Sequence, residues 1–405
     1  MRTATVLAFV SLFAWVCAPA AKAAQVNITA TYSPNKANPT HNSFVNTTPQ
    51  AGYCQWYPAA CANLFSIALP ITFTSLLDIQ PPAVQPDPRM GAYFRMPSSF
   101  RTVMVTHEKN GTTAELKFRV SGFGGAYRLS MPNPPAHAAL WDRTWVNAPA
   151  PCRTSGSGYY SRVEYRWFWL LPEGAGACIK KAKVTIPRPF KYKDMTISYE
   201  LITPDPLNMD LGRYHGSLTL GVGPDRDLDT GYVMTASDDT VTINFNLLVN
   251  HLLKIEFAPG SERAILQPPQ GWQAWMNTGR NPPSLSASQR FNLSSSGKFR
   301  IYLECEYSLT DTCAIQEASA RSKVPVDISI TLPYGVVKRG SQQPVQRQRL
   351  RMGSANAEEF QSVQAQFDRV ASLHYDVAAS ATAQMVAYAG QTYRGTATVV
   401  FDASF

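Results

Sequence analysis

The sequence predicts an all-β protein built from two β-sandwich domains. Short segments in which apolar and polar residues alternate recur along the chain, among them VNITATY at 26–32 and DTVTINFNLLV at 239–249. Alternation with a period of two is typical of strands that bury one face. The 30 prolines suit the ends and edges of many strands. A chain of 405 residues is also longer than one hydrophobic core usually serves.

The polar stretch GPDRDLDTGYVMTASDD at 223–239 is the expected boundary between the domains. We therefore expect a first domain at 24–238 and a second at 239–405. The glycine-rich SGFGG at 121–125 is expected to form a turn between strands. Helical spacing is scarce. The exception is 355–370, where a short surface helix is predicted from apolar residues spaced by three and four: Phe360, Val363, Phe367 and Val370.

Residues 1–23 have the features of a secretory signal peptide. Arg2 precedes an apolar stretch at 6–16, and Ala21 and Ala23 form an A-x-A arrangement typical of a cleavage site. A retained N-terminal anchor is the alternative, but the apolar stretch is shorter than the roughly 18 residues that span a membrane. We therefore expect the mature chain to be exported.

The cysteines fit an oxidising compartment. Once Cys17 has left with the signal peptide, six remain as three pairs of neighbours along the chain, and we expect local disulfides, although other connectivities stay open. The expected bridges are Cys54–Cys61, Cys152–Cys178 and Cys305–Cys313. No pair has C-x-x-C spacing and no histidines cluster nearby, so we expect no metal site.

The net charge of +9 bears on possible partners. The basic residues are spread along the chain without a run of five or six, which disfavours a nucleic-acid partner. A basic exported surface suits anionic glycans or glycolipid head groups, and simple solubility explains the charge equally well.

Recognised catalytic motifs are missing from the sequence. G-x-S-x-G, H-E-x-x-H and G-x-x-x-x-G-K-[ST] do not occur. The adjacent acids at 238–239 and 358–359 lie in polar segments that we expect to be exposed. We therefore expect no enzyme, no catalytic residues and no cofactor.

The chain ends in YRGTATVVFDASF at 393–405. One parity carries mostly apolar residues, which predicts a strand with one buried face running to the last residue. The residues on that parity are Tyr393, Gly395, Ala397, Val399, Phe401, Ala403 and Phe405.

These C-terminal residues carry a resemblance to a known family. GQTYRGTATVVFDASF at 390–405 resembles the C-terminal strand of chaperone–usher pilins, although Ser404 stands where many pilins have an aromatic residue. FRIYLECEYSLTDTCAIQ at 299–316 and KVPVDISITLPYG at 323–335 resemble the pilin domain of tip proteins in the colonization-factor and cable-pilus class. These are two-domain minor pilins described as pilus biogenesis initiators. YELITPDPLNMDLGRYHGSLTLGVG at 199–223 is similar to the end of their adhesin domain.

The resemblance implies two immunoglobulin-like β-sandwich domains, the C-terminal one a pilin domain that lacks a strand. A periplasmic chaperone and then the major pilin subunit would supply that strand, and an outer-membrane usher would export the fibre. The protein would then lie at the fimbrial tip on the cell surface. The strand at 26–32 could be a donor strand or the first strand of the N-terminal domain; we favour a tip subunit because about half of the chain exceeds what a shaft subunit needs.

Receptor binding is expected in the aromatic and basic stretch that begins at residue 137. Aromatic faces stack on sugar rings and arginine binds carboxylates or sulfates bidentately, so an acidic host glycan is the expected ligand. The alternation in RVEYRWFW at 162–169 directs Trp167 and Trp169 to the core. The candidate residues are Arg143, Arg153, Tyr159, Arg162 and Arg166.

A second basic and aromatic stretch, at 87–101, contains Arg89, Arg95 and Arg101. Two other functions stay open. One is a non-adhesive initiator that primes the usher and caps the fibre. The other is an exported carbohydrate-active enzyme, which would require two carboxylates about 5–10 Å apart in a cleft.

Overall fold

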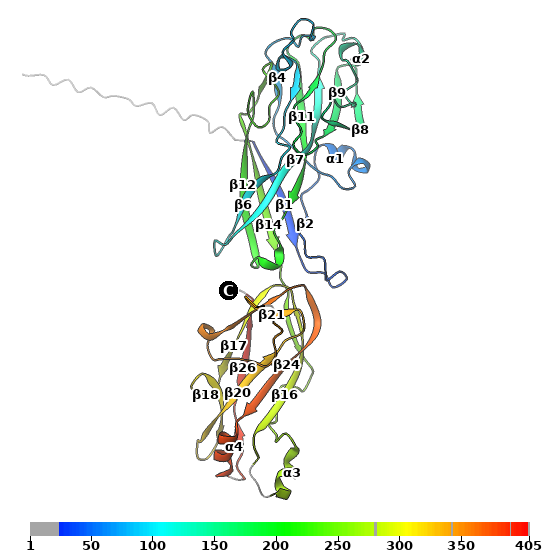
Figure 1. Cartoon of the computed structure of the whole chain (residues 1–405). Helices are drawn as coiled ribbons and strands as arrows, with labels where there is room; N and C mark the ends of the chain where they lie inside the picture. Colours follow the sequence, from blue (N-terminus) through cyan, green and yellow to red (C-terminus); the bar gives the residue numbers. More distant parts are fainter. Residues whose placement is uncertain (1–23, 279–281, 342, 389, 404–405) are drawn as a thin grey trace, which may run out of the picture.

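The structure, a computed structural model, describes residues 24–278, 282–341, 343–388 and 390–403. Strands dominate it, and the prediction of an all-β fold is confirmed. Two hydrophobic cores, drawn from residues 24–249 and 285–381, divide the described residues into two β domains that lie end to end (Figure 1). The predicted signal peptide lies outside the described residues. None of the described helices is long and apolar enough to cross a membrane.

The first domain is organised by a large, strongly curved sheet. Among the described residues this sheet has 12 strands, of which nine follow the order β13-β4-β11-β7-β6-β12-β14-β1-β2, while β3 pairs with β11 and β8 and β9 extend from β7. The strands are β1 (Ala24–Tyr32), β2 (Val45–Asn46), β3 (Phe65–Ala68), β4 (Phe73–Ser75), β6 (Arg101–His107), β7 (Thr113–Arg128), β8 (Arg153–Tyr160), β9 (Glu164–Leu170), β11 (Lys191–Ile202), β12 (Gly212–Gly221), β13 (Met234–Ala236) and β14 (Thr240–Val249).

Shorter elements cover the core on its other side. The ribbon of β5 (Ala92–Phe94) and β10 (Cys178–Lys180) packs there, with Phe94 in contact with the rings of Trp145 and Trp167. The short helices are α1 (Tyr53–Trp56), α2 (His137–Leu140), η1 (Pro58–Ala60), η2 (Pro88–Met90) and η3 (Pro206–Asn208). The resulting core is rich in aromatic side chains.

The glycine-rich segment at 121–125 does not form the predicted turn but lies inside the 16-residue strand β7. The reason is close packing against β9. A Cβ atom at Gly124 would lie 2.2 Å from the carbonyl oxygen of Trp167 and 2.7 Å from the Cα of Phe168. Glycine is therefore required where two backbones approach within a strand.

Strand β1 is an internal strand of the first domain. It pairs in parallel with β14 from Ala24 to Tyr32 and antiparallel with β2. Val26, Ile28 and Ala30 are buried in the core with Tyr32, which is why the segment alternates. Residues 24–32 are therefore occupied within their own domain and are not a free donor strand.

The expected boundary at 238/239 falls directly before β14. This strand pairs along its whole length with β12 and β1, and its inward side chains belong to the first core. We therefore propose to place the division about ten residues later, at 250–252, between β14 and the first strand of the second domain.

The second domain is a sandwich of two sheets. One sheet has the order β15-β16-β24-β20-β19-β18, with β22 and β25 attached, and the other has the order β21-β23-β17-β26. The first sheet consists of β15 (Leu253–Phe257), β16 (Leu285–Ser295), β18 (Tyr307–Leu309), β19 (Thr312–Glu317), β20 (Lys323–Thr331), β22 (Gln348–Arg349), β24 (Gln366–Val377) and β25 (Tyr393–Arg394). The second consists of β17 (Lys298–Cys305), β21 (Val336–Lys338), β23 (Glu358–Ser362) and β26 (Ala397–Asp402), and the helices are α3 (Gly271–Thr278), α4 (Ala379–Val386) and η4 (Ser354–Asn356).

Two sequence predictions in this domain are wrong. The segment 355–370 is not a helix: it forms η4, β23 and the start of β24. The C-terminal segment is not one continuous strand either. Tyr393 lies in β25, and the chain then crosses to the other sheet at Gly395, where a Cβ atom would lie 2.7 Å from the carbonyl oxygen of Ala314. Phe405 lies outside the described residues.

Three disulfide bonds join Cys54 to Cys61, Cys152 to Cys178 and Cys305 to Cys313, the neighbouring pairs expected from the sequence. They close loops in both domains.

Polar contacts fix the first domain against one end of the second. Lys298 Nζ lies 3.0 Å from Asp210 Oδ1, and both side chains are largely buried. The ring of His251 donates from Nε2 to the carbonyl oxygen of Met209 at 3.0 Å, and burial lowers the pKa of this histidine. This end of the second domain is therefore covered, while the opposite end, with α3 and α4, is free in the chain (Figure 1).

Candidate strand-acceptor groove and ligand-binding surfaces

The two sheets of the second domain each end in a strand with one partner. Strand β26 pairs with β17 and β15 pairs with β16; neither has a second partner among the described residues. The two edges face each other across the sandwich, because Phe401 of β26 lies 5.8 Å from the ring of Phe291, which in turn lies 5.2 Å from Phe257 of β15. An open seam thus runs between β15 and β26.

The inward side chains along this seam are incompletely covered. Val399 and Phe401 of β26 and Leu253 and Ile255 of β15 pack against the core but stay partly exposed, and Phe257 is 39% exposed. Inward residues of strands with two neighbours are buried, as they are throughout β14. The seam is therefore a partly exposed apolar strip beside a strand edge with no partner among the described residues, the features that β-strand addition requires. We call it the acceptor groove, lined by Leu253, Ile255, Phe257, Phe291, Val399 and Phe401.

The predicted assembly residues divide between elements. Ala397, Val399 and Phe401 lie in β26, with Val399 and Phe401 facing the groove, whereas Tyr393 and Gly395 precede the crossing between the sheets. On β26, Asp402 accepts a hydrogen bond from Arg300 Nε of β17 at 2.9 Å and helps to fix the register of the edge strand.

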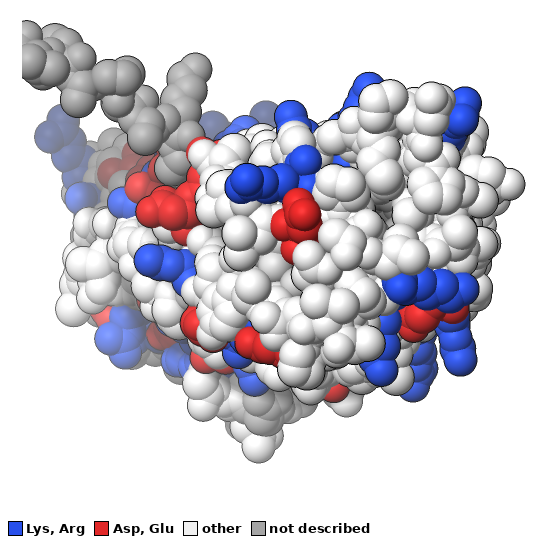
Figure 2. Space-filling view, turned by 90° about the horizontal axis from the view of Figure 1, so that it is seen from above, with Lys and Arg blue, Asp and Glu red and all other residues white. Residues whose placement is uncertain are grey.

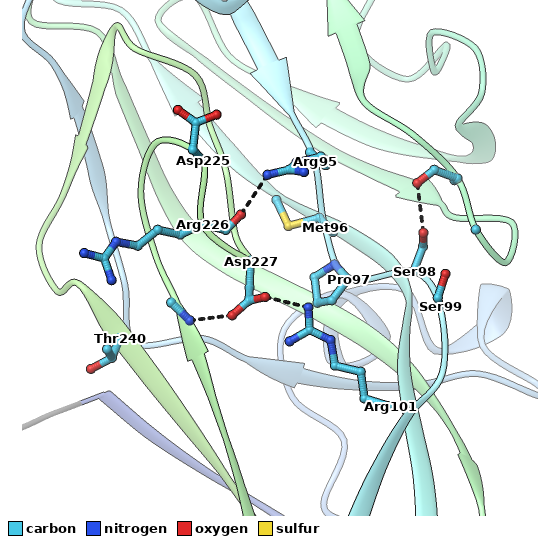
Figure 3. A pocket seen from close by; sticks show the side chains of 13 residues that line it. Arg95, Met96, Pro97, Ser98, Ser99, Arg101, Asp225, Arg226, Asp227 and Thr240 are labelled. Atoms are coloured by element: carbon cyan, nitrogen blue, oxygen red, sulfur yellow. Dashed lines mark hydrogen bonds and ion pairs between the residues drawn. The ribbon is translucent and has the colours of Figure 1, made fainter.

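A hollow of about 760 Å³ opens on the side of the first domain (Figure 3). Three connections form it: residues 95–101 between β5 and β6, residues 174–175 after β9, and residues 221–227 after β12. Its lining combines guanidinium groups, hydroxyls and apolar atoms, and we call it the arginine hollow. The lining includes Arg95, Met96, Pro97, Ser98, Ser99, Arg101, Asp225, Arg226, Asp227 and Thr240.

Ion pairs hold the walls of the arginine hollow together. Arg101 Nη2 lies 2.5 Å from Asp227 Oδ1, and the amide of Gly221 donates to the other oxygen at 2.8 Å. Partial burial would raise the pKa of Asp227, but the hydrogen bonds from Arg101 and Gly221 hold that pKa below its ordinary value. Asp227 is therefore ionised and neutralises Arg101.

Two arginines of the 87–101 stretch form ion pairs with acidic residues of the loop at 221–229. Arg89 Nη2 lies 2.9 Å from Asp229 and 3.0 Å from Asp225, and its guanidinium stacks over the ring of Tyr232. Arg95 lies 3.5 Å from the fully buried carboxylate of Asp229. The guanidinium of Arg89 is thus occupied by contacts within the domain, whereas that of Arg95 is occupied only in part.

Arg226 differs from these residues. It is exposed, and its guanidinium has no ion-pair or hydrogen-bond partner among the residues that the structure describes. In Figure 3 its side chain extends from the loop beside Asp227. The hollow therefore offers the guanidinium of Arg226, the half-exposed Arg95 and the exposed hydroxyl of Ser99, a set of donors that suits an anionic, hydroxyl-rich ligand, whereas the buried Ser98 donates its hydroxyl to the carbonyl oxygen of Ala175.

Four of the five predicted receptor residues lie on the β8–β9 hairpin, and the fifth lies after α2. Tyr159 and Arg166 are direct partners across β8 and β9, so their side chains share a face. Arg153 lies on that face farther along the hairpin, opposite Leu170, and Arg162 lies in the turn between the strands. Arg143 lies in the turn after α2, a helix whose first residue, His137, contacts the turn of the β8–β9 hairpin at the carbonyl oxygen of Ser161.

The face around Arg166 contains two residues that the sequence analysis missed. The guanidinium of Arg166 lies 4.8 Å from the ring of Trp56, and Lys193 of β11 pairs with Glu164 at 2.9 Å beside it. Arg166 also lies within ion-pair distance of Glu164 and is two-thirds covered. Most of its charge is thus balanced, and Tyr159, at 59% exposure, is the most accessible member of this face.

The outer end of the first domain carries no extended patch of one charge. Figure 2 looks onto this end and shows basic and acidic side chains interspersed over a largely uncharged surface. The tryptophans of the 137–169 stretch do not contribute to it, since Trp141, Trp145, Trp167 and Trp169 are all buried.

Among the described residues, no group of three or more histidine, cysteine or acidic side chains is placed to hold a metal ion.

Comparisons with known proteins give a consistent set of structural neighbours at low similarity. No protein-family model and no curated protein matches the chain. The chaperone–tip adhesin complex of CFA/I fimbriae matches 94% of this chain and 96% of that chain at 12% identity and a TM-score of 0.26. CfaE, the adhesive subunit of CFA/I fimbria of enterotoxigenic Escherichia coli, matches 94% of this chain and 92% of its own at 12% identity and a TM-score of 0.25.

The CsuC–CsuE chaperone–tip adhesion subunit complex of the archaic Csu pili of Acinetobacter baumannii matches 94% of this chain and 98% of that chain at 10% identity, with a TM-score of 0.20. The matched proteins are thus fimbrial tip adhesins and their chaperone complexes. Because the TM-scores lie below 0.5, function is argued below from the strands and side chains of this chain.

Proposed function

We propose that this chain is the tip subunit of a chaperone–usher fimbria and initiates its assembly by accepting a donor strand. The observation that carries the proposal is the acceptor groove: β26 has an unpaired edge, and Val399 and Phe401 face an open apolar seam. A strand laid between β15 and β26 would satisfy the edge hydrogen bonds of β26 and cover these side chains.

A periplasmic chaperone would fill the groove first, and the N-terminal extension of the major pilin would then replace it at the outer-membrane usher. The position at the tip follows from β1. Residues 24–32 are built into the first domain and cannot serve as a donor strand without being pulled out of its core. A subunit that accepts a strand and gives none terminates a fibre.

A C-terminal extension tests strand acceptance directly. Strand β26 ends at Asp402, so a short turn followed by an alternating valine and threonine strand could fold back antiparallel along its free edge. We expect the extended chain to unfold at a distinctly higher temperature than residues 24–405. A matched extension with aspartate at the inward positions is the control. Equal unfolding temperatures for both extensions would refute an open groove.

For the first domain we propose binding of an acidic host-surface glycan or glycolipid in the arginine hollow. We prefer this location to the candidates expected from the sequence, Arg143, Arg153, Tyr159, Arg162 and Arg166, because Arg166, which lies on the β8–β9 hairpin with Arg153, Tyr159 and Arg162, already lies within ion-pair distance of Glu164. Tyr159 and Arg166 remain a second candidate surface. The hollow is favoured because it is concave and Arg226 has no partner there among the described residues.

Sulfated and sialylated glycan arrays test this assignment. We expect Arg226→Ala to weaken binding about tenfold or more, as removal of one charge-assisted contact does. Arg143→Ala, which also removes an exposed arginine of the first domain, is the control and should bind normally. If no anionic glycan binds although the groove accepts a strand, the chain is the non-adhesive initiator instead.

The alternative of a carbohydrate-active enzyme is disfavoured by the chemistry of the hollow. Its carboxylates at Asp225 and Asp227 lie beside arginines, and the pKa of Asp227 is lowered. A glycosidase needs one acid with a raised pKa to protonate the leaving group.

A further inference from the structure

We propose that the exposed apolar side chains of Trp272 and Met276 on α3, here called the α3 surface, dock the globular body of the subunit that donates the strand. The inference rests on the proposed function of the acceptor groove and adds a second contact to it. The partner of the α3 surface is the globular domain of an exported pilin, which carries an uncharged, apolar patch next to the point where its N-terminal extension begins.

The connection that carries α3 is far longer than its strands require. Strands β15 and β16 pair with one another, and a turn of about two to five residues would join them. The chain instead places residues 258–284 between them. Long connections in compact domains usually serve a function, often as binding loops.

This connection is anchored at its middle, while its helix is exposed. Leu266 packs against the core and Gln267 forms a bridge with Ser286 of β16. In contrast, Ile265 is 73% exposed, Trp272 41% and Met276 66%. Trp272 and Met276 are four residues apart on α3 and so share one face of the helix, which makes this face a candidate interaction surface.

The direction of the groove places the partner at α3. Strand β26 runs from Ala397, beside Cys305, to Asp402, beside Arg300. The Asp402 end lies toward the first domain, where Lys298 of the adjoining strand pairs with Asp210. A donor strand antiparallel to β26 therefore leaves the groove at the Ala397 end.

Antiparallel pairing is also the arrangement that leaves room for the donor's body. The other end of the groove is covered by the first domain, whereas α3 and α4 lie at the free end (Figure 1). The body that follows the donor strand must consequently come to rest near α3.

The chemistry of the α3 surface defines what can bind. Helix α3, with the sequence GWQAWMNT, contains no charged residue. The ring of the exposed Trp272 lies 5.7 Å from that of the partly buried Trp275, with the two rings edge to face. Tryptophan and methionine are typical of the buried centres of protein interfaces, and an uncharged surface favours an apolar partner over an anionic glycan or a membrane surface.

Two measurements separate this docking contact from strand acceptance. The donor is first identified as the pilin whose N-terminal extension, added as a synthetic peptide, raises the unfolding temperature of the mature chain. Full-length donor and extension peptide are then compared by hydrogen exchange. We expect the amides of residues 265–277 to be protected only by the full-length donor.

The variant Trp272→Ala/Met276→Ala provides the second measurement. We expect its complex with the full-length donor to dissociate at least about tenfold faster, while its complex with the peptide is unchanged. Tyr334→Ala is the matched control, because Tyr334 is 91% exposed but follows β20, away from α3. It should leave both complexes unchanged.

The outcomes are distinguishable. If no extension peptide stabilises the chain, the proposed function fails and the docking proposal falls with it. If the peptide stabilises the chain but 265–277 are protected equally by peptide and donor, or the double variant behaves like the parent, strand acceptance stands and the docking proposal is refuted. Protection of 265–277 by the chaperone alone would equally refute the assignment to the next subunit.

Discussion

Replacing Phe401 by alanine should cost much more stability when the acceptor groove is filled than when it is empty. In the free chain Phe401 is partly exposed and contacts Phe291 from one side. A donor strand would cover its other side. Truncating a fully buried phenylalanine costs about 3–5 kcal/mol, whereas a side chain that is covered on one side loses about half of that. We therefore expect a difference of about 1.5–2.5 kcal/mol between the two forms.

The assay compares urea unfolding of the mature chain and of the chain with the complementary C-terminal strand, each with and without Phe401→Ala. The unfolding transition of the second domain is identified as the transition whose urea midpoint shifts when the strand is appended. Ile328→Val is the control, because Ile328 of β20 is buried in the core of the same domain and should cost about 1 kcal/mol in both forms. Equal costs of Phe401→Ala in both forms would refute the idea that Phe401 faces a groove.

Three further predictions concern the first domain. Replacing Cys152 and Cys178 by alanine should lower the free energy of unfolding of this domain by about 3–4 kcal/mol, because their disulfide closes a loop with a sequence separation of 26. Calorimetry measures the loss, and a loss below about 1 kcal/mol would contradict a stabilising role of this disulfide. Because the pKa of Asp227 is lowered in the folded domain, its ionised form stabilises the domain at pH values above the ordinary aspartate pKa, and this stability is lost as the pH falls through the folded-state pKa. Asp227→Asn should therefore make the unfolding temperature fall less steeply below about pH 4. An unchanged slope would contradict the pairing of Asp227 with Arg101. Gly124→Ala should destabilise the domain by several kcal/mol, of the order of other overpacking changes, because its Cβ would collide with the backbone of β9, and near-parental urea unfolding would contradict that contact.

The sequence predicted the class of fold because alternation survives locally in each strand. Strand β14 shows this clearly, because every second residue is apolar in the sequence and is buried in the structure: Val241, Ile243, Phe245, Leu247 and Val249. Local pattern is weaker where strands are short. In 355–370 the spacing of three and four arises from two strands separated by a turn, with Phe360 buried and Val370 61% exposed on β24.

The candidate sites depend on contacts that no local pattern reveals. The arginine hollow joins residues 95–101 to 221–227, segments more than a hundred residues apart, and the loop acids at Asp225, Asp227 and Asp229 read in isolation as an exposed polar stretch. The basic and aromatic stretch at 87–101 was a usable signal for Arg95 and Arg101. Nothing in the sequence singled out Arg226, because its significance lies in lacking the carboxylate partner that its neighbours have.

Strand β1 of the first domain and strand β26 of the second differ in how completely they are covered. In the first domain β1 pairs with β14 along its whole length and with β2 at Ala30 and Thr31, and its apolar side chains are buried. In the second domain the inward face of β26 has no such cover. Pulling β1 out to complete another subunit would expose five buried side chains, at about 1.5–3 kcal/mol for each large one, and would open the core of the first domain. Under the proposed function, strand exchange would therefore run in the direction that leaves this chain at the end of the fibre.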